Sequence, residues 1–325
     1  MCTSIGMKTA DFYFGRNMDL EYEFGEHVVI TPRNYPFNFR KAGEMKCHYA
    51  IIGMASVVEN YPLYADAGNE YGLCMAGLNF PDNAYYPSEE SSVKYNVSPF
   101  EIIPFVLGKC KNVEEARKLL LNTQLVDIPF SKDIPVATLH WHIADKNSSI
   151  VLESTKDGMK IYDDPVNVLT NNPTFDFHIT NLAHYQNLTV GFPENCLSKY
   201  DEIQSFGKGL GSFGLPGDFS PTSRFVKSAY LLMNSVCAED EESSVSQFFH
   251  LLDSVAVVRG SIDLQNKLSY CTTYSSCINA DKGIYYYKTY SNNSLTAVNM
   301  NNENLDDCCL KEFQLAKSQA VTWAN

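Results

Sequence analysis

Several features of other protein classes are missing from this 325-residue sequence. It has no run of 18 or more apolar residues, so no transmembrane helix is expected. It has no basic surplus, because 25 Lys and Arg against 38 Asp and Glu give a formal charge of −13. This charge argues against nucleic acid or an anionic membrane surface as partner. The N-terminus lacks the basic and apolar regions of a secretory signal, since Lys8 and Asp11 interrupt it, and we expect a cytoplasmic protein.

Motifs of several enzyme and binding classes are also absent. The ten cysteines have no regular spacing and no CxxC pair, so we expect free thiols in a reducing compartment rather than a disulfide framework. The glycine-rich stretch 206–217 has no strand-then-helix frame for a dinucleotide motif. No G-x-S-x-G elbow surrounds Ser4 or Ser223. We therefore expect neither a dinucleotide site nor a serine hydrolase.

The sequence does contain enough apolar and aromatic residues for a large core. Hydrophobic residues make up 45 %, with 20 Tyr and 19 Phe, which argues against disorder. No composition break marks a linker, so we expect a single domain over residues 1–325. Helical patterns come in pairs between sets of short alternating segments. This order predicts an α+β fold whose mainly antiparallel sheets are covered by helix pairs.

The expected elements follow from alternation, helical periodicity and capping residues. Ser98 is expected to cap one helix with Pro99 at its first position, and Asn112 begins a capping box for the next. The expected helices cover 98–107, 112–120, 175–185, 221–232 and 245–257. The expected strands cover 2–7, 11–15, 28–30, 48–54, 73–80, 137–144, 149–153, 159–162, 166–171, 270–278, 283–290 and 295–300.

The N-terminal stretch has the residue types of a nucleophile that carries its own base. Cys2 follows Met1, whose removal we expect because cysteine is small, and one residue would then hold both a thiol and a free α-amine. Reference pKa values of about 8.5 and about 8 put these two groups near neutrality, and such an amine is a known base. A predicted hairpin returns Arg16 and Asp19 beside Cys2, where a cation favours the thiolate. From these residues alone, an ordinary surface Arg–Asp pair remains the alternative.

A second candidate cluster is the histidine pair on a predicted strand. His140 and His142 are two residues apart, so their side chains point to the same face. A metal site would need further ligands, and none lies nearby in the sequence. We therefore interpret both as partly exposed strand histidines. The acidic clusters 239–242 and 306–307 are interpreted as solvated loop faces.

Nine ordered motifs carry a family resemblance over essentially the whole chain. They resemble the choloylglycine hydrolase family, the bile salt hydrolases and penicillin V acylases of the N-terminal-nucleophile hydrolases. The resemblance implies a four-layer αββα sandwich, in agreement with the α+β prediction. The motifs are Met-Cys-Thr at 1–3, Phe-Gly-Arg-Asn-Met-Asp at 14–19, Ile-Thr-Pro-Arg-Asn at 30–34, Asn-Glu-Tyr-Gly-Leu at 69–73, Ala-Gly-Leu-Asn-Phe at 76–80, Leu-Thr-Asn-Asn-Pro-Thr-Phe-Asp at 169–176, Gly-Leu-Pro-Gly-Asp-Phe at 214–219, Ser-Arg-Phe at 223–225 and Lys-Gly-Ile-Tyr-Tyr-Tyr at 282–287.

The resemblance also implies the chemistry. It implies hydrolysis of an amide through a thioester, with no cofactor and no metal, and none of the six catalytic positions departs from the family pattern. The implied positions are Cys2 as nucleophile, Arg16 beside its sulfur, Asp19 at the new α-amine, Asn79 and Asn171 at the oxyanion hole and the base, and Arg224 as the second active-site arginine.

Substrate and assembly are expectations of the same kind. Family members that prefer penicillin V commonly carry Tyr where this chain has Asn79, so the resemblance favours glycine- or taurine-conjugated bile salts. The alternatives are a penicillin V or N-acyl homoserine lactone acylase with the same chemistry, and a non-catalytic amphiphile-binding protein that retains Met1. The resemblance suggests a homotetramer, with loops such as 190–215 as contacts. The expected steroid-groove residues, each equally explained as an ordinary loop hydrophobe, are Met18, Phe24, Phe130 and Ile134.

Overall fold

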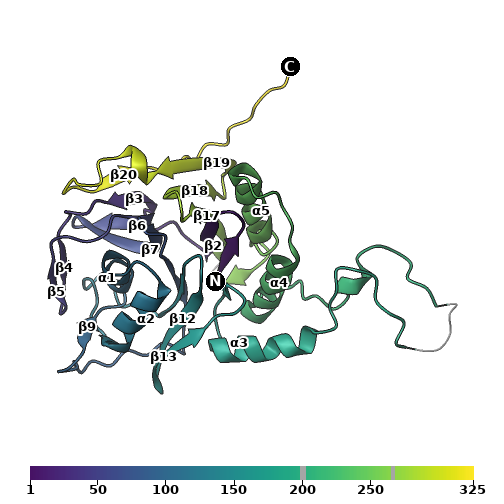
Figure 1. Ribbon diagram of the computed structural model, residues 1–325, viewed down its shortest axis with the longest axis horizontal. Helices are drawn as coiled ribbons and strands as arrows, with labels where there is room; N and C mark the ends of the chain where they lie inside the picture. Colours follow the sequence, from purple (N-terminus) through teal and green to yellow (C-terminus); the bar gives the residue numbers. More distant parts are fainter. Residues whose placement is uncertain (198–202, 265–267) are drawn as a thin grey trace.

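Two antiparallel sheets form the centre of the molecule (Figure 1). The structure is a computed structural model that describes residues 1–197, 203–264 and 268–325. In spatial order, the six-stranded sheet contains β14 (Val168–Leu169), β1 (Cys2–Lys8), β2 (Phe12–Leu20), β17 (Cys271–Asn279), β18 (Ile284–Thr289) and β19 (Asn292–Asn299). The eight-stranded sheet contains β13 (Gly158–Asp163), β12 (Ser149–Thr155), β11 (Leu139–Ala144), β8 (Cys74–Asn79), β7 (Tyr61–Asn69), β6 (Ile51–Val58), β3 (His27–Thr31) and β20 (Lys311–Phe313).

Helices cover the outer face of each sheet. Figure 1 shows α1 (Ile102–Lys109) and α2 (Val113–Leu121) outside the eight-stranded sheet, and α4 (Pro221–Asn234) and α5 (Glu241–Asp253) outside the six-stranded one. The predicted αββα sandwich is therefore confirmed. Among the helices that the structure describes, none has the length and apolarity to span a bilayer. The remaining elements are α3 (Phe175–Asn181), β4 (Phe37–Phe39), β5 (Gly43–Met45), β9 (Tyr95–Val97), β10 (Thr123–Leu125), β15 (Asp263–Leu264), β16 (Leu268–Ser269) and the 3₁₀ turns η1 (Leu182–Tyr185), η2 (Leu210–Ser212) and η3 (Met300–Asn302).

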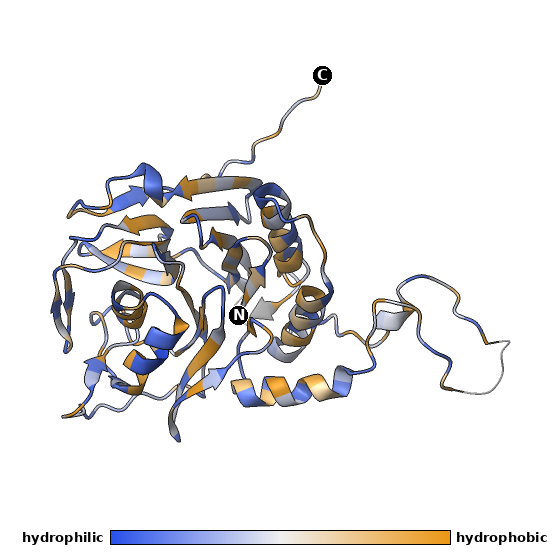
Figure 2. Ribbon diagram, in the orientation of Figure 1, coloured by the Kyte–Doolittle hydropathy of each residue, from blue (hydrophilic) through white to orange (hydrophobic). Residues whose placement is uncertain are grey.

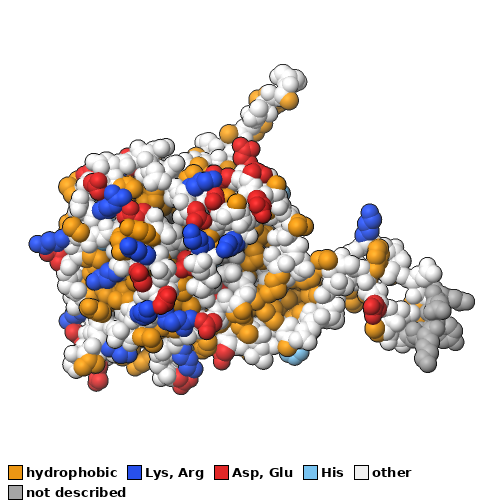
Figure 3. All heavy atoms as spheres, viewed as in Figure 1, with side chains coloured by type: hydrophobic (Ala, Val, Ile, Leu, Met, Phe, Trp, Pro, Cys, Tyr) orange, Lys and Arg blue, Asp and Glu red, His pale blue; other side chains and the backbone are white. Residues whose placement is uncertain are grey.

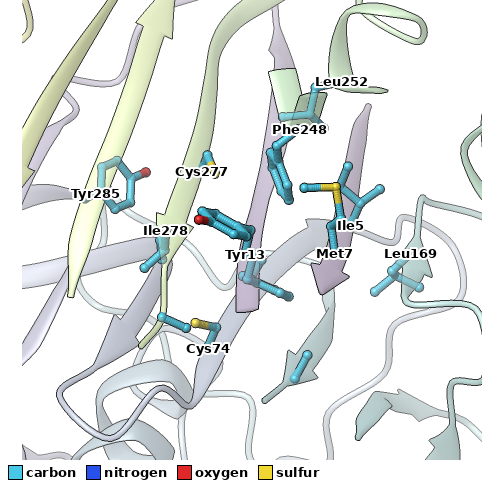
Figure 4. Close-up of a cluster of buried hydrophobic side chains, with 14 of the residues drawn as sticks. Ile5, Met7, Tyr13, Cys74, Leu169, Phe248, Leu252, Cys277, Ile278 and Tyr285 are labelled. Carbon is cyan, nitrogen blue, oxygen red and sulfur yellow. The ribbon is translucent and has the colours of Figure 1, made fainter. Parts of the chain in front are cut away.

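Apolar side chains fill the space between layers, and Figure 2 shows hydrophobic segments on strands of both sheets. Figure 4 shows Ile5 and Met7 of β1 beside Phe248 and Leu252 of α5. Because β1 lies between the other sheet and the α4–α5 layer, its first six residues are all buried. The N-terminus of the chain is thus held inside the molecule.

The observed elements differ from the predicted ones in several places. Strand β7 was not predicted, because Pro62 and a run of small residues hide its alternation. Helix α1 begins at Ile102, so the predicted cap at Ser98 is wrong. Residues 98–101 form a separate turn, in which the Glu101 carboxylate accepts a hydrogen bond from the Ser98 backbone N–H. The strand expected at 166–171 ends at Leu169, two residues before the predicted catalytic Asn171. The cap at Asn112 is confirmed, since its side chain accepts from the Glu115 backbone N–H.

All ten cysteines are free thiols, and all ten lie within the described residues. Five of them are buried in the layers of the sandwich, including Cys74 and Cys277, whose thiols have pKa values raised by burial. The expectation of free thiols is therefore confirmed.

Between η1 and α4 the chain leaves the body of the molecule as a long arm, here defined as residues 186–219 (Figure 1). The described part of the arm carries exposed apolar side chains, and Figure 3 shows hydrophobic surface where the arm leaves the body. The most exposed of them are Val190, Phe192, Leu197, Phe206 and Phe213.

Candidate active site

The first hairpin places the predicted nucleophile. β1 pairs with β2 so that Cys2 lies opposite Met18, and the Cys2 Sγ is 3.9 Å from the Met18 Sδ. Cys2 is only 2 % exposed. Because side chains alternate along a strand, Cys2 points between the two sheets and Thr3 points toward α4. The site therefore receives groups from both faces of β1.

Arg16 approaches from the inner face and is fully buried. Its guanidinium donates to the carbonyls of Ala65, at 3.3 Å, and Gly77, and its Nη2 lies 3.5 Å from the Met18 Sδ that also contacts Cys2. A register shift between β6 and β7 leaves Ala65 without a cross-strand partner, so its carbonyl is available to Arg16. Burial acts to lower the pKa of Arg16, but neighbouring negative charges, led by Cys2, outweigh it and raise that pKa above its ordinary value.

Asp19 lies at the chain terminus. Its Oδ1 accepts from the Thr272 hydroxyl at 2.6 Å, and its buried Oδ2 has no hydrogen-bond partner among the described residues. The Met1 α-amine donates to the Asp19 carbonyl at 2.9 Å and contacts the Tyr270 hydroxyl. Burial raises the pKa of the Asp19 carboxyl and lowers the pKa of the Met1 α-amine. With Met1 in place, the terminal amine lies one residue before the nucleophile.

Asn171 and Arg224 approach the backbone of Cys2 from the α4 side. The Asn171 Oδ1 accepts from the Cys2 N–H at 2.8 Å and from the Arg224 Nη2 at 2.7 Å. The Arg224 Nη1 donates to the Thr3 hydroxyl at 2.6 Å and to the Cys2 carbonyl. Burial lowers the pKa of Arg224, and the charges of Asp19 and Cys2 oppose that effect. These contacts join three segments that are far apart in sequence.

Asn79 joins the site through its backbone. Its carbonyl accepts from the Asn171 Nδ2 at 2.6 Å, which positions the end of β8 next to Asn171. Its side chain is exposed and accepts a hydrogen bond from the Thr138 hydroxyl at 3.3 Å. The structure thus brings all six predicted catalytic residues together, while their individual roles stay predictions.

Two further groups were not found from the sequence. Asp66, fully buried on β7, accepts hydroxyl hydrogen bonds from Tyr274 and Tyr285 at 2.7 Å and from Ser276 at 3.1 Å. Burial raises the pKa of Asp66, while the positive charge of Arg16 is the largest opposing effect. The other group is Tyr270, whose hydroxyl contacts the Met1 α-amine. A single carboxylate in an apolar strand gives no periodic signal, so only the buried Arg16 could have indicated that an anion was needed.

The predicted groove residues separate into two groups. Phe130 and Ile134 line an apolar cavity of about 160 Å³, together with Leu63 and Leu139. Leu139 pairs with Asn79 across the β8–β11 ladder, so one lining residue of the cavity lies beside a predicted catalytic residue. Met18 contacts Cys2 and does not line the cavity. Phe24 packs against the core cluster that contains Cys2 and is likewise not a lining residue.

The interpretation of the two histidines as partly exposed is wrong, although their common face is as expected. His140 and His142 are both fully buried between the sheets. The His142 Nδ1 lies 2.9 Å from the Ser4 hydroxyl, and burial lowers the pKa of His142 to about 3. Among the described residues, the grouping found with metal-ligand spacing is elsewhere, at the exposed loop 307–309. The histidines are therefore internal polar residues.

Comparison with known proteins agrees with this geometry. Residues 2–313 match the linear amide C–N hydrolases, choloylglycine hydrolase family. The chain is 47 % identical to a bile salt hydrolase/transferase of Lactiplantibacillus plantarum over 100 % of this chain and 99 % of the relative, and 41 % identical to one of Clostridium perfringens over the whole of both. The crystal structure of a mutant conjugated bile acid hydrolase from Clostridium perfringens matches with a TM-score of 0.92 and 39 % identity, covering 100 % of both chains. The chain therefore belongs to the choloylglycine hydrolase family of linear amide C–N hydrolases.

Proposed function

We propose that this amidohydrolase cleaves the amide bond of glycine- or taurine-conjugated bile acids with Cys2 as nucleophile. The observation that carries the proposal is the clustering of five polar residues around the buried Cys2, which follows Met1: Arg16, Asp19, Asn79, Asn171 and Arg224. The relatives that match over the full length are named as bile salt hydrolases, which supports the substrate class.

Removal of Met1 is the first step of the proposal. It converts the Cys2 N–H, which already donates to the Asn171 Oδ1 at 2.8 Å, into an α-amine. The unpartnered Asp19 Oδ2 is available to the additional protons of that amine. A buried carboxylate oxygen without a donor is costly, so maturation supplies a partner that the unprocessed chain lacks.

The reaction then follows from the placement of the groups. The Cys2 Sγ attacks the amide carbonyl carbon, and its proton passes to the α-amine directly or through water. Donors at Asn79 and Asn171 stabilise the tetrahedral oxyanion, where one donor is typically worth about 3–4 kcal/mol. The α-amine protonates the leaving nitrogen of glycine or taurine, which leaves a thioester on Cys2. Water hydrolyses the thioester and restores the thiol.

The remaining polar residues orient these groups. Arg16 lies where its charge stabilises the Cys2 thiolate, and Asp19 orients the α-amine. Arg224 fixes the Cys2 carbonyl and the Asn171 amide at once. The cavity at Phe130 and Ile134 supplies apolar surface for part of a steroid. We also propose Met18 as a lining residue at the sulfur, whereas Phe24 has no support from the cavity.

A direct test compares substrates and maturation in one preparation. We expect a higher kcat/KM for glycocholate or taurocholate than for penicillin V or an N-acyl homoserine lactone, since this ratio measures discrimination. We expect an intact mass without Met1 and no turnover in Cys2→Ala. Full activity in Cys2→Ala would contradict the chemistry, a preference for penicillin V would contradict the substrate, and binding without turnover in a chain that retains Met1 would indicate an amphiphile-binding protein.

The thioester supports a second activity of the same site. Two of the full-length relatives are named hydrolase/transferase, and an amine that reaches the thioester before water would form a new amide. The test is incubation of the bile salt with an excess of a second amino acid, with detection of the exchanged conjugate by mass spectrometry. Release of free bile acid alone would restrict this enzyme to hydrolysis.

We propose that the chain acts as one domain and assembles as a homotetramer through the arm, in the cytoplasm, where its ten free thiols would stay reduced. Exposed Phe206 and Phe213 on the arm would be buried by another copy, as expected for apolar surface that a monomer rarely leaves in water. We expect Phe206→Ser with Phe213→Ser to lower the mass measured by light scattering. Val258→Ser, at an exposed position outside the arm, is the control and should leave the mass unchanged.

A further inference from the structure

The segment that carries Asn171 lies outside the sheet. β14 ends at Leu169, so ladder hydrogen bonds do not fix the next two residues. The Thr170 carbonyl lies 3.0 Å from the His140 Nε2, and the Asn171 carbonyl lies 2.8 Å from the His178 Nε2. Two buried imidazoles from different elements therefore hydrogen-bond consecutive carbonyls of the segment that orients the Asn171 amide.

One carboxylate connects these two imidazoles. The Glu153 Oε1 on β12 lies 3.0 Å from the His140 Nδ1 and accepts from the Phe175 N–H at 3.0 Å. Phe175 is the first residue of α3, which carries His178, and the N-cap residue Thr174 makes no side-chain cap hydrogen bond. Glu153 therefore caps the helix of one imidazole and binds the other directly.

The neighbours of His140 fix how many protons the pair must hold. Both ring nitrogens face oxygen acceptors, the Glu153 carboxylate and the Thr170 carbonyl. Both contacts are satisfied only when His140 and Glu153 together hold one proton beyond a neutral imidazole and a carboxylate, either on the ring or on the carboxyl. Both side chains are fully buried, and the ring stacks on Phe80 with centroids 4.2 Å apart, so water does not replace either contact.

We propose that Glu153, together with His140, is a positioning residue for catalysis that sets the place of Asn171. The proposal rests on the proposed function of Cys2 and Asn171. Glu153 does not touch Cys2 or the substrate cavity in the described residues. It acts through the Thr170 carbonyl and through α3, and one of its carboxyl oxygens serves both the His140 ring and the Phe175 N–H, which neither atom of an amide does while His140 keeps both of its contacts.

Three variants separate this role from packing. Glu153→Gln keeps the volume but removes the carboxylate. Beside a neutral His140, the amide oxygen can keep the Phe175 N–H only if His140 loses a contact, and the amide NH2 can donate to the His140 Nδ1 only if the Phe175 N–H loses its acceptor. Glu153→Asp is one methylene shorter but keeps the carboxylate. His142→Gln is the matched control, because His142 lies on the same strand and the same face, is equally buried, and makes no hydrogen bond to 170–171.

We expect Glu153→Gln to lower kcat for glycocholate by about 10- to 100-fold, the loss that small misplacements of catalytic groups produce, with KM changed by less than about threefold. Glu153→Asp should recover part of the lost kcat, and His142→Gln should retain the wild-type kcat. A packing role predicts the reverse order, with Gln the better replacement. Glu153→Gln with wild-type kcat, or Gln more active than Asp, overturns the proposal.

A second measurement needs no substrate. The Asn171 Oδ1 accepts from the Cys2 nitrogen, so displacement of Asn171 should slow alkylation of Cys2 by iodoacetamide, followed on the N-terminal peptide by mass spectrometry. We expect the rate order wild type, Glu153→Asp, Glu153→Gln. An unchanged alkylation rate in Glu153→Gln would contradict the proposal, whether or not the wild type cleaves bile salts. A wild type that cleaves no bile salt, together with the expected order of alkylation rates, would contradict only the proposed function. If Glu153→Gln does not fold, Glu153→Asp against His142→Gln gives the same comparison.

Discussion

Two buried arginines lie beside Cys2, and their surroundings have opposite effects on their charge. Arg16, on β2, points between the two sheets near Asp66, and negative neighbours raise its pKa despite burial. Arg224 lies on the α4 side, where burial lowers its pKa and Asp19 opposes that effect only in part. The difference indicates that the charge of Arg16 is balanced by the fold, whereas Arg224 contributes mainly directed hydrogen bonds.

The largest expected effect comes from removing Arg16, the arginine whose charge is balanced by negative neighbours. Arg16→Gln removes the largest favourable charge acting on the buried Asp66 carboxyl, and leaving a buried charge uncompensated typically costs about 3–5 kcal/mol. We expect that loss in urea unfolding, with a fall in kcat of about 100-fold or more because the Cys2 thiolate loses its cation. A stability within about 1 kcal/mol of wild type would show that Asp66 does not depend on Arg16.

Removing the other arginine should have a smaller effect on stability. Arg224→Gln loses hydrogen bonds to the Cys2 carbonyl, the Thr3 hydroxyl and Asn171, but it also removes a cation that burial disfavours. We expect a loss of about 2 kcal/mol in unfolding free energy and a fall in kcat of about 10- to 100-fold. The comparison between the arginines fails if Arg224→Gln destabilises the protein more than Arg16→Gln does.

The pH dependence of stability should distinguish the same two variants. Without Arg16, the pKa of the buried Asp66 rises further above its ordinary value of 3.8, so the native state holds a proton that the unfolded state releases. Its unfolding free energy then falls as pH rises above about 4, by at most about 1.4 kcal/mol per pH unit for one proton. Because burial raises the pKa of Asp66 in the wild type as well, we expect the stability gap between wild type and Arg16→Gln to widen only once the pH exceeds the native pKa of Asp66 in the wild type. Urea titrations at pH 4, 5, 6 and 7 would measure this gap. Arg224→Gln is the reference variant, whose unfolding free energy should change less with pH.

The smallest effect concerns the donors to Asp66. Tyr274→Phe removes one of three hydroxyl hydrogen bonds to this carboxylate and leaves the charges in place. We expect a loss of about 1.5 kcal/mol, with kcat reduced by less than about threefold. Tyr285→Phe is the matched variant on the neighbouring strand and should behave alike. A large kcat loss in one variant only would assign that tyrosine a role beyond supporting Asp66.

The sequence allowed prediction of the local part of the site. Alternation at 2–7 and 11–15 predicted the hairpin that returns Arg16 and Asp19 to Cys2, because hairpin neighbours are close in sequence. Asn171 and Arg224 came only from the family resemblance, since their contacts with Cys2 span more than 160 residues and leave no local pattern.

Other features were not predicted from the sequence, for a different physical reason. A sheet covered on both faces buries polar and apolar residues alike, so His140 on β11 has no exposed side and the expectation of partial exposure failed. Asp66 lies in such a strand, beside the register shift that also hid β7 from the alternation pattern. In the central layers, hydrogen-bond partners across the sheets rather than sequence period determine which polar residues are tolerated.

Because Ala65 on β7 has no cross-strand partner, changes of length at different places in the β6–β7 hairpin have different consequences. Glu59 and Asn60 form the two-residue turn between β6 and β7, both with positive φ, and inserted residues there extend into solvent. Deletion of Ala65 would instead leave Tyr64 opposite Ala55 and Asp66 opposite Met54, so Asp66 would still face the other sheet, but the carbonyl that accepts from Arg16 would be lost. A designer who transplants loops onto this scaffold therefore has freedom at the tip of the hairpin, whereas the extra residue before Asp66 must stay to serve Arg16.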